Sequence, residues 1–125
     1  LVEVSVGELL DKLTILEIKQ EKIKDPGKLK YINDEYSVLK DQLNKSVKSD
    51  PKLDELINSL KKINEKLWTI EDDKRLCEKN SDFGDKFVKL SRDVHFLNDD
   101  RAKIKLEINN YTGSKIKEIK EYTKY

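Results

Sequence analysis

One arginine occupies a position where the sequence pattern predicts an apolar side chain. Apolar residues recur at steps of three and four from Phe87 to Leu97, and Arg101 takes the next place before Ile104. A charged side chain between packed helices loses its water, so it needs a carboxylate partner or a bound anion. The planar guanidinium group suits carboxylate and phosphate oxygens in particular. Arg101 is therefore the residue around which we look for a site.

Two stretches place further polar side chains near such positions. Asn98, Arg101 and Lys105 lie along one face of their predicted helix. Around the stretch Trp68–Arg75, one stripe at helical spacing contains Asn64, Trp68, Glu71 and Arg75, of which Glu71 and Arg75 form a possible i,i+4 ion pair. These residues are the candidates for a polar site between helices.

A third stretch is the first predicted helix, where polar residues crowd a segment that is apolar on several sides. They are Glu8, Asp11, Lys12 and Glu17. We expect these four to form mainly a solvated face with local ion pairs, although at least one of them is a candidate for partial burial.

Two interpretations of Arg101 follow. In the structural one, it forms a buried ion pair or an asparagine-assisted network that fixes the helix register. In the functional one, Arg75, Arg101 and Lys105 line a shallow pocket for a small anionic molecule. The candidate ligand-binding residues are Glu17, Glu71, Asp72, Arg75, Asn98, Arg101 and Lys105.

For the other potentially reactive residues, we expect no catalytic or metal-binding role. His95 is the only histidine and has no ligand set at metal spacing around it, and Cys77 falls on an apolar seam with no neighbouring base. The acidic pairs at 72–73 and 99–100 point about 100° apart on a helix, so one residue of each pair can face a given site. We expect no metal and no cofactor.

The elements that position these residues are helices. Apolar spacing predicts four long ones, over about 6–24, 28–47, 51–79 and 85–111. Ser5 with Glu8 forms a capping box, Asp50 and Pro51 open the third helix, and Gly113 closes the fourth. Ser114 is a possible cap for a short last helix containing Ile116 and Ile119.

The fold class follows from the spacing and the short connections. We expect an all-α protein, an elongated antiparallel bundle of about four long helices in two hairpins, with coiled-coil-like packing and a short C-terminal helix. Residues 1–125 form a single helical domain. Separate domains are not expected for a chain of this length.

Composition excludes several partner classes. Lysine and arginine number 26 against 25 acidic residues, with both signs interleaved, so no nucleic-acid footprint and no membrane partner is expected. A single cysteine excludes an internal disulfide, and no apolar run approaches a membrane span. We expect a cytoplasmic protein.

Several segments resemble a known group of proteins. They are Val2–Lys19, Leu67–Asp72, Asn98–Lys105, and the pairs at 113–114 and 121–122. The chain resembles a family of short uncharacterised proteins of bacteria and their phages, classed as a domain of unknown function. The resemblance implies a genomic setting near sugar-transfer and surface-polysaccharide genes, but no activity and no catalytic residues. The three longer segments contain the out-of-pattern polar residues.

Two functions remain open. The first is a non-enzymatic interaction module that binds a protein partner, or itself, through an exposed heptad face. The alternative is a small helical enzyme or binder of an anionic metabolite, similar in architecture to the all-helical chorismate mutases, with an inter-helix site around Arg75, Arg101 and Lys105. The sequence leaves open whether the protein is an enzyme.

Overall fold

The computed structural model describes residues 5–113, and the elements in that range are helices. In chain order they are α1 (Val6–Lys22), α2 (Pro26–Ser46), α3 (Pro51–Lys79) and α4 (Asp85–Tyr111). The all-α prediction with four long helices is confirmed. The short last helix expected after Ser114 lies outside the described residues. None of α1 to α4 combines the length and apolar character needed to cross a bilayer.

Three helix ends form at the predicted residues. The Ser5 hydroxyl accepts from the backbone N–H of Glu8 at 3.2 Å, and the Asp50 carboxylate accepts from that of Leu53 at 2.8 Å. Each bond satisfies a backbone donor that a helix start leaves unpaired. After α4, Gly113 adopts a φ of 62°, which glycine tolerates at no steric cost.

The start of α2 differs from the prediction. The helix begins at Pro26 and not near Lys28, because the Asp25 carboxylate accepts from the Lys28 N–H at 3.0 Å and acts as the N-cap. Proline fits the first turn of a helix, where its missing N–H is not needed. The Asp-Pro-Gly segment therefore separates α1 from α2 and also forms the start of α2.

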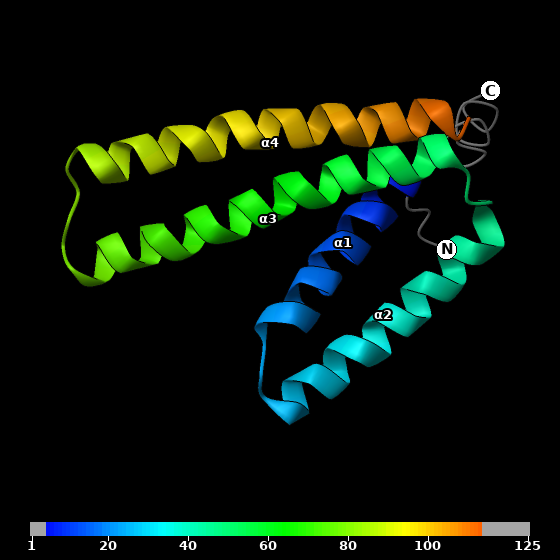
Figure 1. The fold of residues 1–125 in the computed structure, drawn as a ribbon, viewed down its shortest axis with the longest axis horizontal. Helices are drawn as coiled ribbons and strands as arrows, with labels where there is room; N and C mark the ends of the chain where they lie inside the picture. Colours follow the sequence, from blue (N-terminus) through cyan, green and yellow to red (C-terminus); the bar gives the residue numbers. More distant parts are fainter. Residues whose placement is uncertain (1–4, 114–125) are drawn as a thin grey trace, which may run out of the picture.

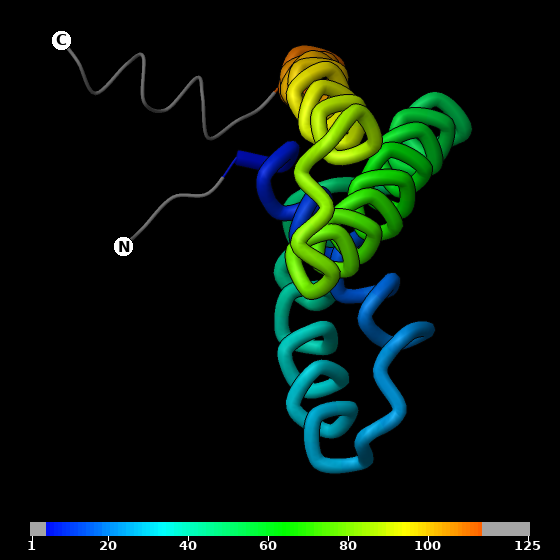
Figure 2. Tube along the Cα trace, turned by 90° about the vertical axis from the view of Figure 1, so that its left-hand side faces the viewer, coloured from blue at the N-terminus to red at the C-terminus, as the bar shows by residue number. Residues whose placement is uncertain are grey.

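The four helices form two antiparallel hairpins that α1 joins. α3 and α4 pack along each other, and α1 packs against α2, α3 and α4. The α1–α2 hairpin is inclined to the α3–α4 hairpin and runs away from it in both views (Figures 1 and 2). The protein is therefore a helical assembly in which α1 is the central connection.

The main core lies where α1 crosses the second hairpin. Its buried members are Val6, Leu9, Leu10, Leu13, Leu43, Leu53, Leu56, Leu60 and Ile108. Leu60 and Ile108 are completely buried, at 0% exposure each. The α3 and α4 members of this core all come from the half of the hairpin that holds the start of α3 and the end of α4.

The other half of the second hairpin extends beyond α1 and α2 (Figure 1). We call residues 65–100 the arm. Within it Leu67 and Cys77 are buried, the latter as predicted, whereas α4 has no buried residue before Ile108. The predicted seam residues Leu90 and Leu97 are only partly buried. Among residues 5–113, no third helix covers this part of the seam, so the regular apolar spacing continues where burial is incomplete.

Candidate functional site

Arg101 meets a carboxylate from α1. Its Nε donates to Asp11 Oδ1 at 2.8 Å, and its Nη2 donates to Asp11 Oδ2 at 2.5 Å. Asp11 is only 4% exposed, so its carboxylate is shielded from water, whereas the Arg101 side chain is 29% exposed. The carboxylate that Arg101 was expected to need is supplied by the protein itself, in the two-pronged geometry that a guanidinium favours.

A glycine allows α1 to approach α4 closely enough for this contact. A Cβ atom added at Gly7 would lie 2.5 Å from the carbonyl oxygen of Lys105, closer than real Cβ contacts come. The Gly7 N–H also donates to Asn109 Oδ1 at 2.7 Å. Gly7 lies about one turn before Asp11, so this backbone contact holds Asp11 beside Arg101.

Asn64 of α3 completes the shell around Asp11. Its amide Nδ2 donates to Asp11 Oδ1 at 3.0 Å and to Thr14 Oγ1 at 2.9 Å. Thr14 Oγ1 in turn donates to the carbonyl oxygen of Asp11 at 2.8 Å. All three residues are buried, and in the described range no buried side-chain polar atom lacks a partner. The site is therefore fully hydrogen-bonded.

Two further charges complete what we call the Asp11 cluster. Lys105 Nζ lies 2.6 Å from Glu8 Oε1 and 3.8 Å from Asp11 Oδ2. At the edge, Arg101 Nη1 donates to Asn98 Oδ1 at 3.4 Å, a long bond. The cluster consists of Glu8, Asp11, Thr14, Asn64, Arg101 and Lys105. Its two cations and two carboxylates balance, so it offers no surplus positive charge to an anion.

The hydrogen bonds in the cluster stabilise the charged forms of both partners. Burial by itself raises the pKa of Asp11, but hydrogen bonds from Arg101 and Asn64 and the charges of Arg101 and Lys105 outweigh it. The pKa of Asp11 is therefore below its ordinary value. The hydrogen bond to Asp11 raises the pKa of Arg101 against its own burial. Both groups are ionised at neutral pH.

Arg75 lies apart from this cluster. Its Nη2 donates to Asp72 Oδ1 at 2.5 Å, and both side chains are exposed. The expected pair between Glu71 and Arg75 is thus replaced by the i,i+3 pair with Asp72. Arg75 lies about 16 Å beyond Asn64 along α3. Of the predicted ligand-binding set, the structure brings together Asn98, Arg101 and Lys105. Glu71, Asp72 and Arg75 lie farther along the arm, away from the Asp11 cluster.

Glu17 belongs to a second, separate network. Its carboxylate lies 3.2 Å from Lys61 Nζ and accepts a hydrogen bond from the Tyr36 hydroxyl at 3.2 Å. Lys61 also reaches Glu21 at 3.2 Å. Burial raises the pKa of Tyr36 most, and the Glu17 charge raises it further. This network links α1 to α2 and α3 on the side toward the end of α1.

The sequence prediction missed Asp11 and Asn64 as members of the site. The signal for Asp11 was its stripe on α1, because Thr14 and Ile18 follow it at steps of three and four, and both are buried. Asn64 was on the predicted α3 stripe, but nothing in the sequence pairs it with α1. The structure places it opposite Arg101 with Asp11 between them.

Comparisons with other proteins place the chain in a family. No curated protein and no solved structure matches it. A model described as a family of unknown function, DUF6165, matches residues 1–125. The match covers the chain from end to end, in agreement with the resemblance to a family of unknown function. The protein therefore belongs to the DUF6165 family.

Proposed function

We propose that this protein is a non-enzymatic interaction module whose contact surface is the arm, residues 65–100. One observation carries the proposal. The heptad seam of α3 and α4 continues along the arm, but no other helix of the described chain covers it (Figure 1). When an amphipathic helix pair leaves its apolar positions half exposed, another chain that packs against them can bury them.

The side chains of the arm support this proposal. Leu76, Phe83, Val88 and Phe96 are each more than half exposed. Scattered apolar residues on a surface are ordinary, but these lie on a structure two helices thick. Most of the stability of a protein helix comes from packing its apolar face, so a two-helix projection gains from a partner that covers it.

The alternative, a binder of an anionic metabolite, has less support. It relies on Arg75, Arg101 and Lys105, of which Arg75 lies elsewhere and the other two pair with Asp11 and Glu8. An anion at this point would have to displace a carboxylate. We favour the structural interpretation of Arg101. The cytoplasmic location and the origin in bacteria or phages remain predictions.

The test compares the arm with other exposed apolar positions. A tagged full chain would be used to recover both lysate proteins and an untagged copy of itself, with Val88→Asp/Phe96→Asp as the arm variant. The control variant is Val38→Asp/Leu106→Asp, since these residues have similar exposure and lie outside the arm. We expect the arm variant to lose what the wild type recovers and the control to keep it.

Circular dichroism of each variant would establish that the helices persist. Equal recovery by all three proteins, or recovery of nothing by the wild type while it stays monomeric at high micromolar concentration, would contradict the proposal.

A further inference from the structure

We propose that the protein binds a small amphipathic anion, a carboxylate or phosphate on an apolar body, in a groove where the ends of its four helices meet. The groove has a volume of about 760 Å³, a size typical of small-molecule sites. We call it the junction groove, and its lining includes Val6, Lys45, Lys48, Leu53 and Tyr111. It lies outside the arm, so this binding goes beyond the proposed function and uses a separate surface.

The helix backbones around the junction groove do not select a charge. α1 and α3 begin beside the groove and α2 and α4 end there, so the four ends gather toward one end of the molecule (Figure 1). A helix start carries partial positive charge, and a helix end carries partial negative charge. Two starts and two ends offset each other. The side chains of the lining therefore decide which ligand fits.

Part of the lining is apolar. Val6 and Leu53 are only 5% and 3% exposed, and Val47 is partly buried. Tyr111 adds an aromatic ring that is still 45% exposed. A ligand with an apolar body that displaces water from these side chains gains binding free energy in proportion to the area it covers.

Several polar side chains of the lining are already bonded within the chain. The hydroxyls of Ser46 and Thr112 donate to backbone carbonyls of the preceding helical turn, at 2.9 and 2.8 Å. The Tyr111 hydroxyl donates to Asp50 Oδ2 at 2.9 Å, and Asp50 Oδ1 accepts from the N–H of Leu53 at 2.8 Å. These groups are satisfied without a ligand.

The remaining polar side chains of the lining are those of Asn44, Lys45 and Lys48. All three are exposed, and within residues 5–113 none of them forms a side-chain hydrogen bond or an ion pair. The two lysines are donors only, and their two positive charges exceed the single negative charge of Asp50. The junction groove therefore favours a ligand whose oxygens carry negative charge.

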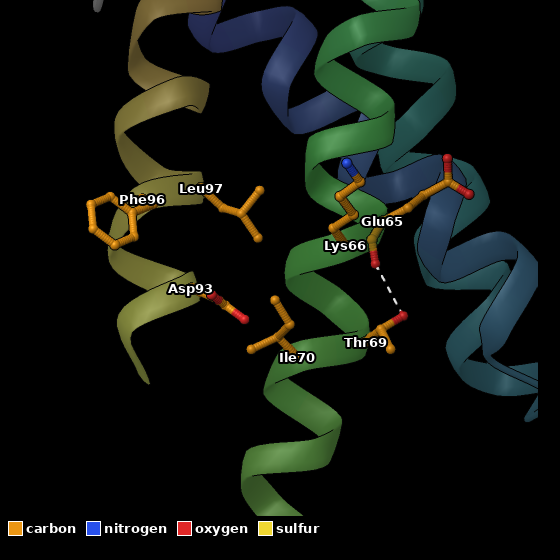
Figure 3. Close-up of a pocket in the computed structure, with 7 residues that line it drawn as sticks. All are labelled: Glu65, Lys66, Thr69, Ile70, Asp93, Phe96 and Leu97. Carbon is orange, nitrogen blue, oxygen red and sulfur yellow. Dashed lines mark hydrogen bonds between the residues drawn. The ribbon is translucent and has the colours of Figure 1, made fainter. Parts of the chain in front are cut away.

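The hollow between α3 and α4 on the arm lacks this preference. Its lining, drawn in Figure 3, includes Glu65, Lys66 and Asp93, so it carries charges of both signs. Asp93 is also already paired with Lys89 at 2.7 Å. Glu65 and Lys66 then offset each other. Of these two cavities, the junction groove is the one whose unpaired charges share one sign.

Nuclear magnetic resonance titration of the full chain tests the ligand class. Octanoate and octyl phosphate supply the two head groups on one apolar body, and octylammonium supplies the same body with the opposite charge. Acetate and inorganic phosphate supply the heads without the body. We expect at least one of the two octyl anions to shift amide signals near Val47 and Thr112. The other three probes should bind at least about tenfold more weakly, because each lacks one of the two contacts.

A pair of variants tests the location of the anion. Lys45→Gln/Lys48→Gln should weaken binding of the octyl anion at least about fivefold, since two charge contacts are lost. The matched control is Lys30→Gln/Lys40→Gln, which changes the net charge equally at two exposed lysines of α2 outside the groove. The control should bind as the wild type does. Circular dichroism of both variants would establish that the helices persist.

Four results would overturn the proposal. They are no shifts with either octyl anion at millimolar concentration, equal binding of octylammonium, shifts centred on the arm, and equal weakening in both double variants. Binding that only the groove variant weakens supports the proposal, and the tighter of the two octyl anions then identifies the head group. Each of these results leaves the arm test unaffected, because the variants compared there leave the junction groove intact.

Discussion

The two halves of the α3–α4 hairpin have the same kind of sequence and different surroundings. Both continue one apolar seam, but in the first half α1 covers it and the side chains are buried, as Leu60 and Ile108 are. In the arm, Leu90 and Leu97 stay partly exposed. Spacing therefore determines where a helix is able to pack, whereas the arrangement of the other helices determines whether it does.

The largest difference between the halves should appear when a leucine is truncated. Leu60→Ala leaves a cavity in a closed core and should lower the free energy of unfolding by about 3 to 4 kcal/mol. Leu97→Ala, at a corresponding seam position in the arm, should cost about 1 kcal/mol because water already reaches it. Urea unfolding at low protein concentration measures both, and equal losses would contradict the comparison.

The Asp11 cluster should be nearly as sensitive. Asp11→Asn removes a buried charge and leaves Arg101 unpaired, so we expect a loss of about 3 kcal/mol. Arg101→Met alone should also destabilise, since it leaves Asp11 buried without its partner.

The double variant Asp11→Leu/Arg101→Met distinguishes a structural ion pair from a binding site. If the pair only holds α1 on the hairpin, the double variant should recover much of the stability lost in the single variants. If the double variant still binds the partner that the wild type recovers, the result would support a structural role for the Asp11–Arg101 pair. Additive losses in the cycle would mean that the two residues act independently.

A smaller effect on the free energy of unfolding should follow from protonation of Asp11 at low pH. Its pKa is below the ordinary value of 3.8, so the stabilisation is complete above that value and is lost as pH falls through it toward the lower folded-state pKa. The difference in unfolding free energy between wild type and Asp11→Asn should narrow as the solution is acidified below about pH 4. A constant difference at all pH values would argue against the ion pair.

The smallest effect should come from the ion pair on the arm. Arg75 and Asp72 are both exposed, so Arg75→Ala should change the free energy of unfolding by less than about 0.5 kcal/mol. The same measurement on Asp11→Asn provides the contrast. A loss at Arg75 as large as that at Asp11 would mean that the arm has a polar contact of its own that matters to folding.

The parts of this fold that can be predicted from the sequence depend on interactions between residues close together in the chain. The caps at Ser5 and Asp50 and the bounds of α3 and α4 depend on neighbours within one turn, so the sequence contains the whole cause. The start of α2 was misplaced because an Asp-Pro pair fits both a break and a cap.

The site was less accessible to such reasoning because its partners come from different helices. The sequence indicated that Arg101 needs a carboxylate, but it did not identify which of the acidic residues would supply it. That choice depends on the close approach of α1 and α4 at Gly7, a property of the assembled hairpins. For the same reason, the sequence suggested that Arg75 lies near Arg101. A stripe shows which residues share a face of one helix, but not which residues of another helix lie opposite them.

Hydrogen exchange of the wild type in dilute solution tests the central claim that the arm is less well covered than the core. In dilute solution, amides of the core around Leu60 and Ile108 should be strongly protected, and those of the arm near Ile70 and Leu97 should exchange faster. Uniform protection along α3 and α4 would contradict the account.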